Sequence, residues 1–182
     1  MNKFEEKTIK TEKIFEGKII SLQVDEVELP NGKTSKRELI KHPGAVAVIA
    51  ITDDNKIVLV EQYRKPLEKT LVEIPAGKLE DGENPIIAAI RELEEETGYT
   101  TNDLHFVTSF YSSPGFADEL LHIYITNELT KVDNPKPGDE DEFVEVLELT
   151  LDEAKQLVTE ERIHDAKTNY AILYLHALEG RE

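Results

Sequence analysis

The sequence predicts an α/β fold, built as one compact domain or as a domain with a small added subdomain. Segments with the alternating pattern of β-strands come first, one helix interrupts them near the middle, and two helical stretches close the chain. The 182 residues suit one domain better than two independent ones. With 39% hydrophobic and 32% charged residues, the chain has the composition of a globular protein that can bury a core.

The expected strands follow one another through the first 75 residues. Apolar and polar residues alternate over 8–29, and the Pro-Asn-Gly sequence at 30–32 provides a hairpin turn. The run that follows Gly44 is apolar throughout and short, which indicates a buried strand. Further strands are predicted over 57–64 and, more briefly, over 71–75.

The second half of the chain contains one helix between strands and two helices at the end. Asn84 can cap a helix that begins with Pro85, and Gly98 is placed to end it. The other expected elements are strands over 104–110, 120–126 and 143–149, and helical stretches over 151–158 and 165–178.

Composition and charge exclude several classes of function. The absence of cysteine rules out disulfides, thiolate nucleophiles and cysteine-based metal centres. The formal net charge of −17 would repel a phosphate backbone, so we expect no nucleic-acid partner. The first residues lack the apolar core of a secretory signal, and no apolar run approaches the ~20 residues of a membrane helix. We therefore expect a cytoplasmic protein with no membrane partner.

The central helix separates an apolar stripe from a group of carboxylates. At roughly 100° per residue, the stripe that must pack on a sheet consists of Ile86, Ala89, Ile90 and Leu93. Glu92, Glu95 and Glu96 lie beside it at i, i+3 and i+4 spacing, where they repel one another. Arg91 can balance one of these charges. Mg²⁺ or Mn²⁺, which take carboxylate and carbonyl oxygens, would balance the rest.

Nine positions between residues 77 and 99 have the spacing of a known motif. They are Gly77, Glu83, Arg91, Glu92, Leu93, Glu95, Glu96, Gly98 and Tyr99. The pattern resembles the Nudix box in every fixed position, and the chain is identified as a member of that family. The resemblance implies an α/β/α sandwich with a mixed sheet. It also implies an enzyme that uses divalent metal ions to cleave compounds in which a nucleoside diphosphate is linked to another moiety.

Other stretches resemble the ADP-ribose pyrophosphatase branch of this family. They are EQYR at 61–64, EIPAG at 73–77 and SSPG at 112–115, in which Pro114 lies fifteen residues past Tyr99. The branch implies hydrolysis of ADP-ribose to AMP and ribose 5-phosphate. Two alternatives stay open: an enzyme for another nucleoside diphosphate sugar or a dinucleotide such as NADH, and a sensor that binds ADP-ribose without hydrolysing it. The three intact glutamates of the helix argue against the sensor.

The resemblance also assigns metal-binding roles. The matching positions are the carbonyl of Ala76, the carboxylates of Glu92, Glu95 and Glu96, and Glu142 in a later loop. Glu95 matches either a ligand or a water-bridging partner. Arg91 is expected to fix the glutamates by an ion pair, and Glu83 to support them. The branch implies two or three Mg²⁺ ions per site, with Mn²⁺ as a substitute.

An acidic loop over 137–145 matches the segment in which the branch carries its mobile catalytic acids. Glu140 aligns best with the general base, and Glu142 with the additional metal ligand. Asp139 and Asp141 stay open as alternatives, and so does a loop that is merely acidic and solvated.

The residues that the branch uses to bind its substrate match eleven positions. They are Ile19, Ile20, Arg37, Glu38, His42, Arg64, Lys78, Ser113, Pro114, Gly115 and Glu119. Ile19 and Ile20 match positions that approach the adenine across a dimer interface, where the family often has an aromatic residue. We therefore expect a homodimer. Residues 1–42 would form an N-terminal β subdomain that dimerises and completes the pocket, and residues 43–182 the Nudix hydrolase domain.

Overall fold

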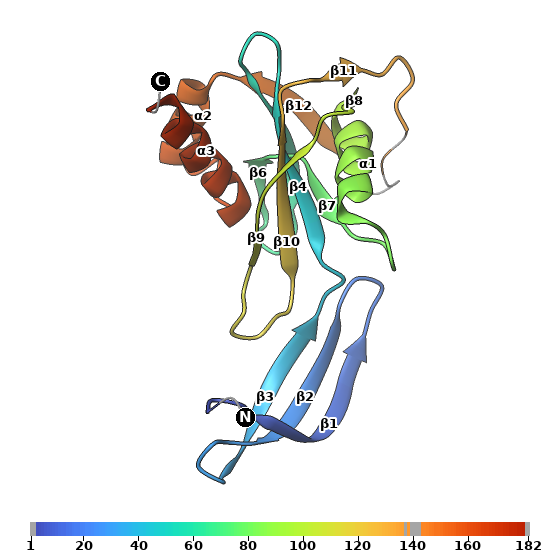
Figure 1. Ribbon diagram of the computed structural model, residues 1–182, viewed down its shortest axis with the longest axis vertical. Helices are drawn as coiled ribbons and strands as arrows, with labels where there is room; N and C mark the ends of the chain where they lie inside the picture. The colour runs from blue at the N-terminus through green and yellow to red at the C-terminus, as the bar shows by residue number, and fades with distance from the viewer. Residues whose placement is uncertain (1–2, 137, 139–142, 181–182) are drawn as a thin grey trace. The chain divides into compact units, whose positions relative to one another are not determined.

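The chain folds into two compact units. The computed structural model describes residues 3–136, 138 and 143–180 (Figure 1). Unit 1 contains Met1–Gly44 and Phe110–Leu121, and unit 2 contains Ala45–Ser109 and His122–Glu182. The segment from the middle of the sequence thus packs with the N-terminal strands.

Unit 1 is built on a three-stranded antiparallel sheet. Its strands are β1 (Lys7–Glu16), β2 (Ser21–Glu28) and β3 (Thr34–Lys41), in the order β1-β2-β3. The strand expected within 8–29 is present as β2, but the segment before it forms a second strand, β1, because the chain also reverses at Gly17, whose amide donates to the carbonyl of Ile20 at 2.9 Å. The predicted turn at 30–32 is confirmed, since the amide of Gly32 donates to Leu29 at 2.9 Å. Ile40 then bridges to Ala117, which extends the unit by one segment.

Unit 2 contains a mixed sheet of seven strands. These are β4 (Ala45–Ile51), β5 (Ile57–Arg64), β6 (Lys69–Glu73), β7 (Ala76–Lys78), β9 (His105–Tyr111), β10 (Leu120–Thr126) and β12 (Val144–Leu149). The order is β12-β5-β4-β10-β9, while β6 pairs with β5 and β7 pairs with β4. A separate pair joins β8 (Tyr99–Thr100) to β11 (Thr130–Lys131).

Helices cover both faces of this sheet. In Figure 1, α1 (Pro85–Thr97) lies on one side, and α2 (Leu151–Thr159) and α3 (Ala166–Glu179) lie on the other. The α/β/α sandwich with a mixed sheet that the resemblance implied is therefore confirmed. Within the described ranges, the helices are too short or too polar to cross a membrane.

Alternation along β4 divides the core between the two faces of the sheet. One buried cluster contains Val46, Val48 and Ala50 of β4 with Ala88, Ala89 and Leu93 of α1. Ala47 and Ile49, which are also buried, point to the opposite face. Because the side chain of Leu93 is fully buried, it contributes roughly 2 kcal/mol to docking α1 on the sheet.

The apolar stripe predicted for α1 was partly wrong. Ile86 is 36% exposed and Ile90 is only half-buried, whereas Ala88 is fully buried. The buried face consists of two rows, Ala88-Glu92-Glu96 and Ala89-Leu93-Thr97. The helix is rotated so that two glutamates face the protein, because β7 offers these carboxylates a close polar contact that isoleucine would not make.

Candidate active site

Two carboxylates of α1, those of Glu92 and Glu96, lie on its buried face. The side chain of Asn84 accepts a hydrogen bond from the amide of Ile86 at 3.0 Å, and Gly98, at a φ of 72°, ends the helix as predicted. The helix therefore has a fixed start and end, and Glu92 and Glu96 are only 8% and 6% exposed. Buried carboxylates require charged or hydrogen-bonding partners. Arginine and the backbone of β7 supply them.

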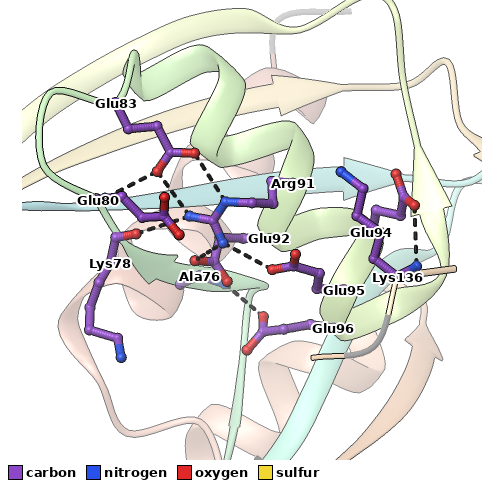
Figure 2. A network of polar contacts seen from close by, with 10 residues as sticks. All are labelled: Ala76, Lys78, Glu80, Glu83, Arg91, Glu92, Glu94, Glu95, Glu96 and Lys136. Carbon is purple, nitrogen blue, oxygen red and sulfur yellow. Dashed lines mark hydrogen bonds and ion pairs between the residues drawn. The ribbon is translucent and has the colours of Figure 1, made fainter. Parts of the chain in front are cut away.

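Arg91 gathers three carboxylates around one guanidinium group (Figure 2). Its Nε and Nη2 donate to the two oxygens of Glu83, each at 3.0 Å. Its Nη1 donates to Glu92 at 2.8 Å and to Glu95 at 2.9 Å. The hydrogen bond with Arg91 lowers the pKa of Glu83, and the same contacts raise the pKa of Arg91. This is the geometry of a side chain that orients the glutamates of the box.

Glu96 and Glu92 both lie against the backbone of β7. The amide of Ala76 donates to Oε2 of Glu96 at 2.9 Å. A Cβ atom built on the next residue, Gly77, would lie 1.9 Å from the carboxylate carbon of Glu92 and 2.1 and 2.2 Å from its oxygens. Glycine is required at this position because the carboxylate fills the space of a side chain.

A break in the sheet at Pro75 brings β7 to this place. The chain leaves β5, with which β6 pairs, and moves to β4, with which β7 pairs. The amide of Val48 donates to the carbonyl of Pro75 at 2.9 Å, which anchors the crossing point. Proline has no amide hydrogen, so the break leaves no unpaired donor there.

Two further predicted residues lie in unit 2. Lys78 is on β7, and its carbonyl accepts a hydrogen bond from Arg91 at 3.3 Å. Arg64, at the end of β5, donates from Nε and Nη2 to Glu73 at 2.6 and 2.7 Å. Glu73 also pairs with Lys167 of α3. Arg64 is therefore held by a protein carboxylate along one edge of its guanidinium group.

Glu73 is buried in this arrangement at 2% exposure. Burial raises the pKa of its carboxyl, but the hydrogen bonds and charges of Arg64 and Lys167 outweigh that effect and lower the pKa to about 2. The sequence offered Glu73 only as part of a motif. Its partner Lys167 is 94 residues away in the chain, and no spacing rule links them.

The other predicted substrate-binding residues lie in unit 1, where two of them come together. Nε2 of His42 is 3.6 Å from Oε1 of Glu119, and the hydroxyl of Ser112 donates to the same carboxylate. The carbonyl of Ser113 accepts two amides from residues 116 and 117 and so closes the turn formed by Pro114 and Gly115.

The remaining residues of this group are on β3 and in the first turn. Arg37 donates to both oxygens of Glu6, at 2.8 and 2.7 Å, and has an ion-pair partner within its own unit. Its neighbour Glu38 is exposed. Ile19 and Ile20 are exposed between β1 and β2.

The acidic residues predicted to act in catalysis belong to the loop at 137–145, of which the structure describes only part. Glu140 and Glu142 lie outside the described residues, as do the alternatives Asp139 and Asp141. The predicted base and the predicted additional ligand therefore stay predictions.

Comparison with known proteins identifies the family. Residues 41–170 match the NUDIX domain, and residues 6–40 match the nucleoside diphosphate sugar hydrolase N-terminal domain. The chain belongs to the Nudix family. The membership predicted from nine spaced residues is thus confirmed.

Several Nudix relatives match this chain along most of its length. A methanol dehydrogenase activator of Bacillus methanolicus is 64% identical over 97% of this chain and 96% of its own. An ADP-ribose pyrophosphatase of Bacillus subtilis is 60% identical over 99% and 97%, and one from Mycobacterium tuberculosis is 33% identical over 94% and 83%. A crystal structure of an ADP compounds hydrolase has the same fold, with a TM-score of 0.84, 22% identity and coverage of 97% and 96%.

The donors at the box suit a divalent cation of the kind that Nudix hydrolases generally use. Three carboxylates, Glu83, Glu92 and Glu95, share the guanidinium group of Arg91. Glu96 adds a fourth carboxylate on the same helix, so negative charge is in excess. All the donors are hard oxygens, as Mg²⁺ prefers. Among residues 3–136, 138 and 143–180, no three acidic or imidazole side chains already converge as they would on a bound ion. The chemistry of the donors fits such an ion, and binding it would require small side-chain movements.

Proposed function

We propose that this Nudix protein hydrolyses the diphosphate of ADP-ribose, giving AMP and ribose 5-phosphate. The observation that carries the proposal is its 60% identity to the Bacillus subtilis ADP-ribose pyrophosphatase over 180 residues, which is 99% of the chain. The glutamates of the box are intact, and their close packing on β7 is consistent with an active enzyme.

The metal-binding residues in this proposal are the glutamates of α1 and the strand beside them. Glu92, Glu96 and the carbonyl of Ala76 would hold Mg²⁺ directly, with Glu95 as a ligand or through water and Glu142 as a further ligand. Two or three ions, which Mn²⁺ could replace, would neutralise the diphosphate and make the attacking water more acidic. Arg91 keeps the glutamates oriented and is not itself a ligand.

The remaining proposed roles are substrate binding and proton transfer. Arg64 and Arg37 would contact the diphosphate or ribose, and Glu140 would take the proton from the attacking water. The other residues proposed to contact the substrate are Ile19, Ile20, Glu38, His42, Lys78, Ser113, Pro114, Gly115 and Glu119. Gln substitutions at Glu140 and Glu142 test the roles proposed for the loop. A loss of turnover of about 10²-fold in Glu140→Gln would support Glu140 as the general base, and a loss only in Glu142→Gln would assign that role to Glu142.

A panel of substrates tests the proposal against its alternatives. Initial rates are compared for ADP-ribose, GDP-mannose and NADH at saturating Mg²⁺, because relatives at 36% identity are GDP-mannose and ADP-sugar pyrophosphatases. We expect kcat/KM to be highest for ADP-ribose. A higher kcat/KM for another compound would make that compound the preferred substrate. Tight binding of ADP-ribose without release of AMP would indicate a sensor.

A second candidate function is activation of a methanol dehydrogenase. The 64% identity to the Bacillus methanolicus activator over 177 residues favours it. The rate of that organism's methanol dehydrogenase is measured with and without this chain, and with a Glu96→Gln variant as the control. Activation by the wild type and not by the variant would show that the two functions share the box.

We also propose a homodimer formed through the N-terminal β subdomain of residues 1–42, with residues 43–182 as the hydrolase domain. The strand β1 is exposed along its whole length and carries exposed apolar side chains at Ile9, Ile14 and Phe15. Unit 1 holds nine of the 21 Lys and Arg and ten of the 38 Asp and Glu, so most of the negative charge that would oppose association is in unit 2.

Sedimentation of the wild type and of an Ile14→Asp variant at micromolar concentration tests the dimer. We expect the variant to be monomeric and to bind ADP-ribose more weakly. A wild-type monomer with full activity would contradict the dimer. The cytoplasmic location expected from the sequence stays a prediction.

A further inference from the structure

Four groups of alternating charge connect α3 to the end of β5. Glu73 is the third of them, counted from α3, and it pairs on one side with Arg64, at 2.6 and 2.7 Å, and on the other with Lys167. Lys167 donates in turn to Asp165 at 3.0 Å. Asp165 caps α3 by accepting from the amide of Thr168, also at 3.0 Å, where the partial positive charge of the helix stabilises it. The positive end of the row is Arg64.

The start of α3 and the loop before it also contact the backbone of β6 and of the residue after it, just before the Nudix box. The amide of Val72 donates to the carbonyl of Arg162 at 2.9 Å, and the amide of Ile74 donates to the hydroxyl of Thr168 at 3.0 Å. Val72, Ile74 and Thr168 are all buried. Residue 72 is thus fixed by a backbone–backbone hydrogen bond, residue 73 by two cationic side chains, and residue 74 by a hydrogen bond to a side-chain hydroxyl. Ala76 follows two residues later.

The guanidinium group of Arg64 has donors that Glu73 does not occupy. Glu73 occupies Nε and one hydrogen of Nη2, and among the described residues Nη1 has no hydrogen-bond partner. The side chain is 38% exposed, whereas that of Lys167 is 13% exposed. The hydrogen bond with Glu73 and, less strongly, the charge of Glu96 raise the pKa of Arg64. Arg64 therefore lies within electrostatic reach of the box, with donors turned away from its partner.

We infer that Lys167 is a positioning residue for substrate binding: it holds Glu73 from the α3 side, and Glu73 fixes the direction in which Arg64 presents its open edge to the diphosphate. A carboxylate with a single cationic partner could follow that partner as it moves. With Lys167 in place, Glu73 is clamped between two elements, and the arginine bound to it is held in one orientation. This inference rests on the proposed function, in which Arg64 contacts the phosphates.

The test compares three variants with the wild type. Lys167→Met removes the lysine that holds Glu73, and Glu73→Gln with Lys167→Met removes both charges of the buried pair. The matched control is Lys155→Met on α2, which removes a half-buried lysine paired with Asp152 and Glu179. KM and kcat are measured with whichever panel compound the wild type hydrolyses fastest, and melting temperatures are recorded. We expect Lys167→Met to raise KM about tenfold with kcat within about threefold, because a uniform binding contact is weakened.

The double variant separates positioning from stability. Its melting temperature should recover part of the way toward that of the wild type, because residue 73 no longer carries an uncompensated buried charge, although Asp165 still lacks its lysine. KM should stay raised, because a neutral amide holds an arginine poorly. Recovery of KM together with melting temperature would overturn the inference, and so would an unchanged KM in Lys167→Met. If another panel compound is hydrolysed faster than ADP-ribose, the proposed function is overturned. The inference about Lys167 is still tested in that case, since the variants are measured on the best substrate.

Discussion

Replacing Gly77 with alanine should damage the active site while leaving the fold nearly intact. The added Cβ would lie 2.1 and 2.2 Å from the oxygens of Glu92, and ordinary contact begins near 3.4 Å. The carboxylate must therefore retreat by more than an ångström. The atoms that move are the far end of a flexible side chain, so the backbone of β7 can stay in place. Gly77 does not have a positive φ, so alanine suits its conformation.

The magnitudes for activity and stability differ enough to be separated. Displacement of a ligand by about 1 Å can reduce turnover by about 10²-fold, which corresponds to roughly 2.7 kcal/mol of activation free energy. The stability change is smaller. Loss of the hydrogen bond from Arg91 to Glu92 costs about 1 kcal/mol, and the lower entropy of the unfolded alanine chain offsets part of that cost.

Turnover at saturating Mg²⁺ and the free energy of unfolding measure the two effects. Gly180→Ala is the control, because the nearest atom to its Cβ is 4.0 Å away and the position is at the end of α3. We expect Gly77→Ala to lose activity about 10²-fold with unfolding free energy within about 1 kcal/mol of the wild type. Activity within twofold of the wild type would refute the idea that this placement of Glu92 is needed.

Three further predictions concern charge. Glu96→Gln should lower turnover by about 10²-fold or more with an unchanged or higher melting temperature, and near-normal turnover at limiting Mg²⁺ would contradict its metal role. Arg91→Met should lower the free energy of unfolding by about 2 kcal/mol, and added Mg²⁺ should restore part of this stability. A loss of stability that Mg²⁺ does not change would count against a cation site beside the glutamates. The folded-state pKa of Glu73, about 2, is below the ordinary 4.5, so its stabilisation of roughly 3 kcal/mol is complete above pH 4.5 and is lost as the pH falls toward 2. Glu73→Gln should therefore lose less stability than the wild type between pH 5 and 3, and parallel curves would refute this.

Local signals in the sequence were sufficient for the central helix and for the family. Asn84, Pro85 and Gly98 act through their nearest neighbours, so the start and end of α1 could be read from residue types. The buried face of the same helix could not. Its rotation depends on β7, which offers the amide of Ala76 to Glu96 and the open space of Gly77 to Glu92.

Contacts between segments far apart in the chain could not be predicted from the sequence. The turn at Gly17 was missed because it lacks a turn signal as strong as the Pro-Asn-Gly sequence at 30–32. The pairing of Glu73 with Lys167 joins a strand to a helix 94 residues later. The stretch around Arg64 suggested a substrate contact, but nothing in it revealed that a buried carboxylate holds this arginine.

The products formed from ADP-ribose are the direct test of the proposed hydrolysis. The purified chain is incubated with ADP-ribose and Mg²⁺, and AMP and ribose 5-phosphate are quantified by chromatography, with a parallel sample in excess chelator. We expect the two products in equal amounts with Mg²⁺ and neither product with the chelator. Equal rates in both samples, or intact ADP-ribose in the presence of Mg²⁺, would contradict the proposal.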